Sequence, residues 1–146
     1  MRITQEADYA LRIVYYLAST EDFVDAKTIA EVTGTPERFT LKILRKLLVA
    51  GFLTSHKGVG GGYSMAADPK SLSMKDVIEL IDGPVAISRC ADPEHICSRV
   101  GACKGECTFH CIFNRINSIL ADRLASVSID MVSSGEYTTE EILKNI

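Results

Sequence analysis

Apolar side chains recur every three or four positions at the start of the chain, which is the spacing of an amphipathic helix. This pattern predicts a first helix over residues 3–18. A second helix is expected to begin after Asp25, whose carboxylate can cap free backbone amides. It should end before Gly34, because glycine is common just beyond helix ends.

A third helix is the best delimited element of the chain. Thr35 offers a capping hydroxyl, and Pro36 is expected at the first helical position, where its missing N–H costs little. Apolar residues continue at helical spacing to Ala50, and Gly51 closes the helix. The second and third helices, joined by a tight glycine turn, are arranged as in a helix-turn-helix. An ordinary helical hairpin would give the same pattern.

Two short β-strands are predicted directly after the third helix. Residues 52–56 and 63–66 have strand character, and the glycine-rich stretch 57–62 is expected to form a tightly turning tip. This stretch lacks the residue order of a nucleotide-binding P-loop and is followed by a strand instead of a helix. A hairpin in this position is the wing of a winged helix.

Two further long elements complete the prediction. Ser73 caps a fourth helix, with Asp76 reaching back to it. After a loop, apolar residues hold one helical face over residues 109–131, which predicts a helix of about 25 residues and roughly 37 Å. So small a domain does not need this length for its own core, and the spare apolar face predicts contact with a second copy of the chain. A short capped helix is expected in the tail after residue 133.

The expected fold is therefore mainly α-helical with a small β-hairpin. We divide the chain into a winged helix-turn-helix domain at 1–83, a cysteine-rich loop at 84–107, and a dimerisation helix with a C-terminal tail at 108–146. Composition agrees with a folded domain, since 47% of the 146 residues are hydrophobic and 24% are charged. No apolar run approaches the roughly 18 residues of a membrane-spanning helix, and a signal-peptide pattern is missing. A cytoplasmic protein without membrane contact is expected.

Positive charge is concentrated around the third helix and the hairpin, although the chain as a whole has a formal net charge of −3. Between Gly34 and Ser64, Glu37 is the only acidic residue, against the basic residues Arg38, Lys42, Arg45, Lys46 and Lys57. The spacing of Arg38, Lys42 and Arg45 places them on one helical face, which can lie in the major groove of double-stranded DNA. Lys57 and the wing amides can then approach the DNA backbone or the minor groove. The alternative is a solvated helix face beside an ordinary hairpin.

The five cysteines all lie in one short segment, at Cys90, Cys97, Cys103, Cys107 and Cys111. An odd number without a secretory signal argues against a disulfide scaffold and favours soft-metal or redox chemistry. Thiolates in a glycine-containing loop can converge on an iron–sulfur cluster. Zinc also suits four thiolates, but the paired C-x-x-C spacing usual for structural zinc is missing. Cys111 is expected to be a buried packing residue, and Cys107 to lie at a helix start, where the helix dipole favours a thiolate.

These features together resemble the IscR-type (Rrf-two) family of bacterial transcription regulators. The resemblance rests on Arg2-Ile3-Thr4…Tyr9-Ala10-Leu11, the helix-turn-helix, the wing at 58–63 and the cysteine-rich loop before a long helix, and it covers essentially the whole chain. It implies a homodimeric DNA-binding repressor or activator, and not an enzyme. Lys57 takes the place of a wing arginine common in the family, and lysine lacks the planar fork of arginine. The predicted DNA-contacting residues are Arg2, Thr35, Pro36, Arg38, Phe39, Lys42, Arg45, Lys46, Lys57, Gly60, Gly61 and Tyr63.

The cysteine spacing is similar to that of the cluster-binding, IscR/NsrR-like branch of this family. Cys90, Cys97 and Cys103 match its three-cysteine spacing, whereas the segment 107–110 resembles its last-cysteine and histidine segment, so Cys103 and Cys107 compete for one place. The predicted ligands are Cys90, Cys97, Cys103 and Cys107, with His110 as a substitute. They would hold a 2Fe-2S cluster, in preference to 4Fe-4S, that senses iron, redox state or nitric oxide. The alternatives are a cluster-free regulator that uses zinc or a reversible disulfide, and an electron carrier that houses a cluster.

Overall fold

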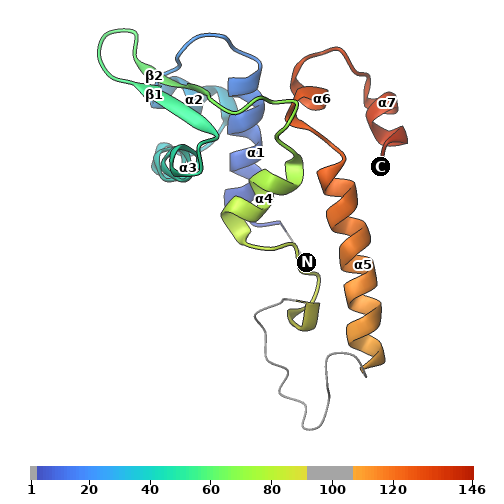
Figure 1. Ribbon diagram of the computed structural model, residues 1–146. Helices are drawn as coiled ribbons and strands as arrows, with labels where there is room; N and C mark the ends of the chain where they lie inside the picture. The colour runs from blue at the N-terminus through green and yellow to red at the C-terminus, as the bar shows by residue number, and fades with distance from the viewer. Residues whose placement is uncertain (1–2, 92–106) are drawn as a thin grey trace.

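Helix α1 is surrounded by the other helices of the N-terminal half and by the hairpin in the computed structural model (Figure 1). The structure describes residues 3–91 and 107–146. Within these ranges the elements are α1 (Gln5–Ala18), α2 (Ala26–Thr33), α3 (Glu37–Val49), β1 (Leu53–His56), β2 (Gly62–Met65), α4 (Met74–Asp82), the 3-10 turn η1 (Arg89–Ala91), α5 (Thr108–Ala125), α6 (Ile129–Ser133) and α7 (Thr139–Lys144). The mainly helical fold with a small β-hairpin is confirmed. None of these helices is long and apolar enough to cross a membrane.

The hydrophobic core lies between α1 and the elements packed around it. α1 contacts α2, α3, α4, α6 and β2. Its fully buried side chains meet apolar residues from each neighbouring helix, and the larger members of this core are Ile13, Val14, Leu17, Ile29, Ile43, Leu44, Leu47, Val77 and Ile129. Removal of these side chains from water is the main force that holds the elements together. The position of α3 on the molecule is therefore fixed mainly by its packing against α1.

The two ends of α2 are fixed by local interactions. The Asp25 carboxylate accepts hydrogen bonds from the amides of Lys27 and Thr28 at 3.0 and 3.1 Å, and Gly34 adopts a left-handed conformation with φ of 65°. Both features confirm the predicted limits of α2. The predicted start of α3 was wrong by one residue, because Pro36 is the N-cap and the Thr35 side chain caps nothing. The Pro36 carbonyl instead accepts the first helical hydrogen bonds.

The hairpin is a two-stranded antiparallel sheet with Leu53 opposite Met65 and His56 opposite Gly62. It is attached to the body by a short bridge in which the amides and carbonyls of Val24 and Tyr63 exchange hydrogen bonds of 3.0 and 2.8 Å. This bridge places the wing directly beside the helix-turn-helix.

Helix α4 begins with a complete capping box, as predicted. The Ser73 hydroxyl accepts from the Asp76 amide at 3.2 Å, and the Asp76 carboxylate accepts from the Ser73 amide at 2.9 Å. The helix ends at Asp82, with Gly83 as its C-cap. At this end the Asp82 carboxylate also accepts a hydrogen bond of 3.0 Å from the Thr4 amide, which ties α4 to the start of α1.

The predicted helix of about 25 residues is broken in the structure, and this expectation was wrong. α5 has 18 residues and ends at Ala125, and the short α6 follows with Ser128 as its N-cap. Val127, which lies between the two helices, and Ile129, the first residue of α6, are only 2% and 1% exposed. The Val127 carbonyl accepts from the Met74 amide at 2.9 Å, so the chain turns back onto the start of α4.

Helix α5 extends away from the core and packs mainly against α4 and the turn η1 among the described elements (Figure 1). Within the described part of the chain, none of its residues is buried. One side of the helix carries a row of exposed apolar residues, which are Phe109, Ile112, Ile116 and Ile119. The tail ends in α7, whose capping box between Thr138 and Glu141 confirms the short helix predicted there.

Candidate nucleic-acid interface and cysteine site

The turn before α3 is built around the buried residue Thr35. Thr35 is 3% exposed, and its hydroxyl accepts a hydrogen bond of 3.0 Å from the Thr33 hydroxyl. Its amide donates to the Ala30 carbonyl at 3.0 Å. The Thr35 side chain, predicted to contact DNA, therefore supports the turn from within, whereas the neighbouring Pro36 is exposed.

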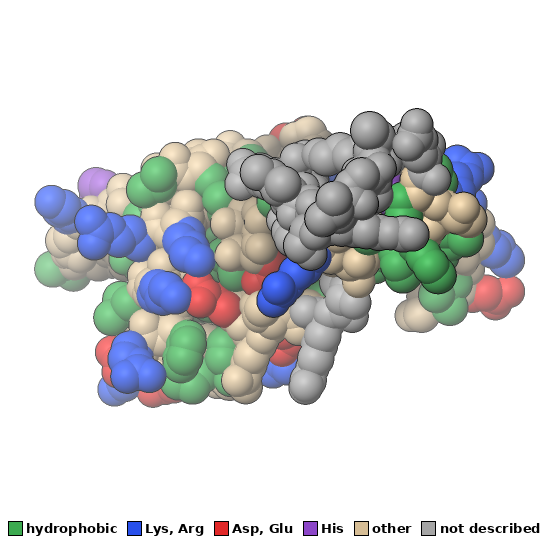
Figure 2. Space-filling view, turned by 90° about the horizontal axis from the view of Figure 1, so that it is seen from below, with side chains coloured by type: hydrophobic (Ala, Val, Ile, Leu, Met, Phe, Trp, Pro, Cys, Tyr) green, Lys and Arg blue, Asp and Glu red, His purple; other side chains and the backbone are tan. Residues whose placement is uncertain are grey.

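The outer face of α3 carries the predicted basic residues. Arg38 and Arg45 are exposed, and the Arg38 guanidinium lies 5.3 Å from the centre of the Phe39 ring. Phe39 is half-buried against Tyr9 of α1, with 6.0 Å between ring centres, so it anchors the N-terminal end of α3. Figure 2 shows Lys and Arg side chains gathered over the part of this face that holds α3 and the hairpin, with acidic side chains among them.

Lys42 and Lys46 lie on the same helix, but both are paired with one carboxylate. The Lys42 ammonium lies 2.7 Å from one carboxylate oxygen of Glu6, and the Lys46 ammonium lies 2.8 Å from the other. These contacts hold the pKa of the Glu6 carboxyl below its usual value of 4.5, chiefly through the hydrogen bond from Lys42. Glu6 was missed by the sequence analysis, because nothing in its local sequence shows a contact with a residue 36 positions away.

The outer face of α3 also has a hollow that the sequence analysis did not predict. Its lining consists of Leu41, Lys42, Arg45, Lys46, Val49 and Ala50 of α3 and its C-cap, together with Leu80 of α4. Leu41 and Val49 are 48% and 85% exposed. This face therefore presents apolar side chains between its cations.

Close backbone packing explains two of the wing glycines. A Cβ atom at Gly61 would lie 2.3 Å from the His56 carbonyl oxygen, and one at Gly62 would lie 2.3 Å from the Val24 carbonyl oxygen. Gly60 and Lys57 are exposed at the tip. Tyr63 is half-buried, packs against the core and bonds to Val24 through its backbone, so it serves to dock the wing. Among the residues predicted to contact DNA, Arg2 lies outside the described residues.

Cys90 and His110 meet at the base of α5. The His110 ring nitrogen Nδ1 lies 2.7 Å from the Cys90 carbonyl oxygen, and Nε2 lies 2.8 Å from the Asn114 side-chain nitrogen. Cys107 is the N-cap of α5, three residues before His110, and is half-buried. The Cys90 sulfur lies 3.2 Å from the Ser88 hydroxyl.

The remaining predicted ligands, Cys97 and Cys103, lie outside the described residues. Among the residues that are described, no three His, Cys, Asp or Glu side chains are grouped closely enough to hold a metal ion. Cys111 is exposed in the single chain, so the prediction that it is a buried packing residue was wrong. It lies on α5, which extends away from the core.

The segment before the cysteines is fastened to two helices. The Asn117 side chain of α5 accepts from the Ile87 amide at 3.1 Å and donates to the Val85 carbonyl at 2.6 Å. The Val85 amide donates to the Glu79 carboxylate of α4 at 3.1 Å. Glu79 and Asn117 were missed because their partners are backbone groups, which a sequence pattern does not show.

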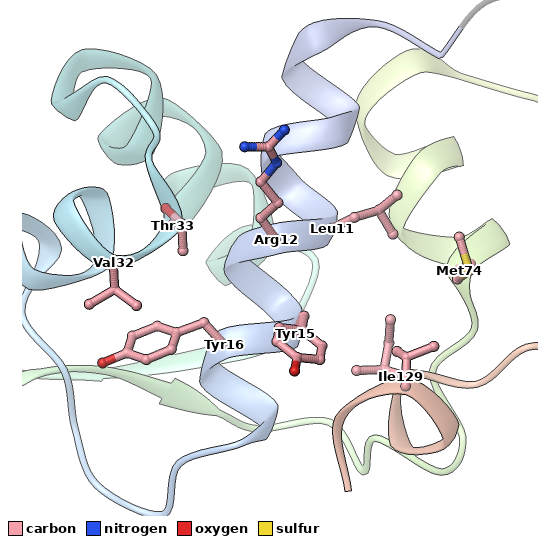
Figure 3. A pocket seen from close by; sticks show the side chains of 9 residues that line it. Leu11, Arg12, Tyr15, Tyr16, Val32, Thr33, Met74 and Ile129 are labelled. Atoms are coloured by element: carbon pink, nitrogen blue, oxygen red, sulfur yellow. The ribbon is translucent and has the colours of Figure 1, made fainter. Parts of the chain in front are cut away.

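A separate apolar pocket lies between α1, α2, α4 and α6 (Figure 3). Figure 3 shows Leu11, Tyr15 and Tyr16 of α1 around it, with Val32, Met74 and Ile129 from the neighbouring helices. Arg12 at its rim pairs with Asp8 at 2.7 Å. The lining includes neither a thiol nor a carboxylate.

A helix-turn-helix followed directly by a two-stranded wing, with cations on the outer face of α3, defines a winged helix-turn-helix protein. The sequence pattern of the Rrf2 family, described as iron-dependent transcriptional regulators, matches residues 3–134. The chain therefore belongs to the Rrf2 family and is a DNA-binding transcriptional regulator. The family and its relatives are regulators and not enzymes, as the sequence analysis predicted.

Individual relatives agree with this assignment. The chain is 38% identical over 112 residues to an rrf2-like HTH-type transcriptional regulator of Rhodobacter capsulatus, which covers 70% of this chain and 75% of that protein. It is 28% identical over 149 residues to the HTH-type transcriptional regulator IscR of Vibrio parahaemolyticus, covering 99% of this chain and 82% of that protein. CymR, the global cysteine regulator of Bacillus subtilis, has the same fold with a TM-score of 0.73 and 21% identity, covering 92% of this chain and 97% of that chain.

Proposed function

We propose that the chain is a cytoplasmic, homodimeric regulator that reads operator DNA with α3 and the wing and holds an iron–sulfur cluster in its cysteine segment. The ligands would be Cys90, Cys97, Cys103 and Cys107, with His110 as a substitute. The observation that carries the cluster proposal is the 2.7 Å contact between the His110 ring and the backbone carbonyl of Cys90, which brings these two residues together at the base of α5. A cluster would supply iron–sulfur bonds that break when the cluster is oxidised or loses iron.

The donor set fits this chemistry. Sulfur and imidazole donors suit iron and zinc, and the Cys107 position at the N-terminus of α5 favours a negatively charged thiolate. With its proton on Nδ1, His110 donates to the Cys90 carbonyl, and its Nε2 lone pair accepts from Asn114. Metal-binding histidines usually donate their second ring nitrogen to a backbone carbonyl in this way. His110 can therefore bind a metal through Nε2 if Asn114 moves aside.

The cysteine segment is linked to the DNA-reading surface through α4. Glu79 and Asn117 fasten the segment before Cys90 to α4 and α5. α4 in turn packs against α1 and α3. A change in the ligands at the base of α5 would shift this link, and the spacing of the two α3 helices in a dimer would change with it. Such a two-state element is what a switch requires.

The apolar row on α5 supports a homodimer. Phe109 is 68% exposed and Ile112, Ile116 and Ile119 are 44–49% exposed, at spacings that place them on one side of the helix. A long apolar row on a helix that extends from the core is typical of an interface between identical subunits. We therefore place the dimer contact on this face of α5.

Anaerobic purification tests the proposal. The oxygen-free protein should be coloured and should bind a fragment of its own promoter, and Cys97→Ala should lose both the colour and the cluster-dependent part of the affinity. Cys111→Ala is the matched control and should keep both, because Cys111 is not among the proposed ligands. Zinc in place of iron would favour the cluster-free alternative. A colourless, metal-free protein with unchanged promoter binding would remove the sensor part of the proposal and leave the regulator part standing.

A further inference from the structure

The Glu6 carboxylate offsets positive charge on α3, the helix that it contacts. It is the second residue of α1, its side chain is only 18% exposed, and each of its oxygens faces one lysine of α3. Lys42 and Lys46 are one helical turn apart, so a single carboxylate spans both ammonium groups. The lysines keep 56% and 35% of their side-chain exposure, which leaves them at the surface but directed toward α1.

The two arginines of α3 differ from the two lysines in this respect. Within the described part of the chain, neither Arg38 nor Arg45 makes an ion pair, and both are exposed. DNA phosphates can be contacted by such groups without breaking another contact. If Lys42 or Lys46 contacts a phosphate, its ion pair with Glu6 must break or be shared with that phosphate. The Glu6 carboxylate then lies near the DNA and repels the phosphates.

We propose that Glu6 acts as a built-in competitor of DNA phosphate, holding the Lys42 and Lys46 ammonium groups against α1 and so limiting the sequence-independent affinity of α3. This inference rests on the proposed DNA-reading role of α3. Phosphate contacts strengthen binding to every sequence alike, whereas base contacts discriminate between sequences. With two cations withheld, recognition depends more strongly on Arg38, Arg45 and the wing. Glu6 is therefore a specificity-determining residue although it lies on α1.

The test compares Glu6→Gln with Asp8→Asn on a labelled mixed-sequence duplex. Asp8→Asn is a matched control, because it removes one negative charge from the same turn of α1 but its partner is Arg12 on the same helix. Glu6→Gln should tighten binding about three- to tenfold and steepen the slope of log affinity against log salt by about one to two, as for one or two added phosphate contacts. Asp8→Asn should leave the slope unchanged. Equal effects of the two variants, or an unchanged or weaker Glu6→Gln, would overturn the inference.

A mutant cycle with Lys42 and Lys46 tests whether these lysines cause the gain in affinity of Glu6→Gln. In a Lys42→Gln, Lys46→Gln background, adding Glu6→Gln should gain much less affinity than it does alone, and an equal gain would contradict the inference. If Glu6→Gln does not fold, lysine modification of the wild type gives the answer. Duplex DNA should protect Lys57 from acetylation more strongly than Lys42 and Lys46, and equal protection of all three would contradict it.

Arginine variants separate this inference from the proposed function. Arg38→Ala and Arg45→Ala should each weaken duplex binding and lower the salt slope by about one. If neither does so, the assignment of α3 as the reading helix fails. If both do so while Glu6→Gln binds no more tightly than the wild type, only the role of Glu6 fails.

Discussion

Single residues show where sequence reasoning succeeds and where it stops. The caps at Asp25 and Ser73 were predicted correctly, since each side chain bonds to amides within three residues of itself. The contacts of Glu6 with α3 and of His110 with Cys90 join residues 36 and 20 positions apart. No local pattern encodes such distances, because they depend on how the helices pack.

Glu6 also predicts a dependence of stability on pH. Lys42 and Lys46 lower the pKa of its carboxyl in the folded state below 4.5, so the ion pairs stabilise the fold above that pH. The contribution is lost as pH falls through the folded-state pKa. Because partly exposed pairs contribute about 0.2 to 1 kcal/mol each, Glu6→Gln should lower the melting temperature by a few degrees at neutral pH.

Thermal unfolding at a series of pH values measures this difference. The gap in melting temperature between the wild type and Glu6→Gln should be constant near neutrality and should narrow below pH 4.5. Asp8→Asn provides the comparison for a solvent-exposed pair on the same helix. A gap that stayed constant into the acid range would show that the carboxylate charge is not its cause.

At the scale of elements, the wing is held by backbone contacts that leave no room for side chains. Gly62→Ala would place a Cβ atom 2.3 Å from the Val24 carbonyl oxygen, so either the hairpin or the loop before α2 must shift. The expected loss of stability is about 1 to 3 kcal/mol, as for other overpacked sites. Urea unfolding followed by circular dichroism measures it.

Gly60→Ala is the control for the wing. Gly60 has a φ of 73°, and no atom lies within 4 Å of the place that an alanine Cβ would take, so alanine there meets only the backbone penalty of the left-handed conformation. Gly62→Ala should therefore also weaken the docking of the wing, seen as faster hydrogen exchange at the Val24 and Tyr63 amides. Equal exchange rates in the two variants would contradict the role assigned to this bridge.

The end of α5 is the element that the sequence pattern misread. Val127 and Met131 continue the apolar spacing of α5, which suggested one uninterrupted helix. In the structure Val127 is buried beside the start of α4, and Met131 lies in the separate helix α6, so neither residue belongs to α5. A periodic pattern shows that residues share a face, but not that they face the same partner.

The apolar row on α5 predicts the effect of charge at its centre. Ile116→Glu would place a carboxylate on the proposed dimer face and should convert the protein from twice the 16.0 kDa chain mass to the mass of one chain. Ser118→Glu, an exposed position on the other side of α5, should remain dimeric. Light scattering on a sizing column gives both masses. An Ile116→Glu protein that stays dimeric would exclude this face as the interface.

In the molecule as a whole, α4 contacts the proposed DNA-reading helix α3 and also bonds through Glu79 to Val85, which precedes the cysteines. The positions of α3 and the wing follow from the core around α1, and for this reason the sequence predicted the winged-helix half closely. The cysteine site was predicted mainly from residue type and spacing. Of its predicted ligands, Cys90, Cys107 and His110 are described, and the first and last of these are in contact.

The proposal that matters most for this Rrf2-family regulator is an iron–sulfur cluster on its cysteine segment. A visible and Mössbauer spectrum of iron-57-labelled protein, purified without oxygen, tests it most directly. We expect a coloured protein whose spectrum shows iron bound by sulfur in a 2Fe-2S cluster, and Cys90→Ala should lose that signal. A colourless protein whose spectrum shows no cluster iron would contradict it.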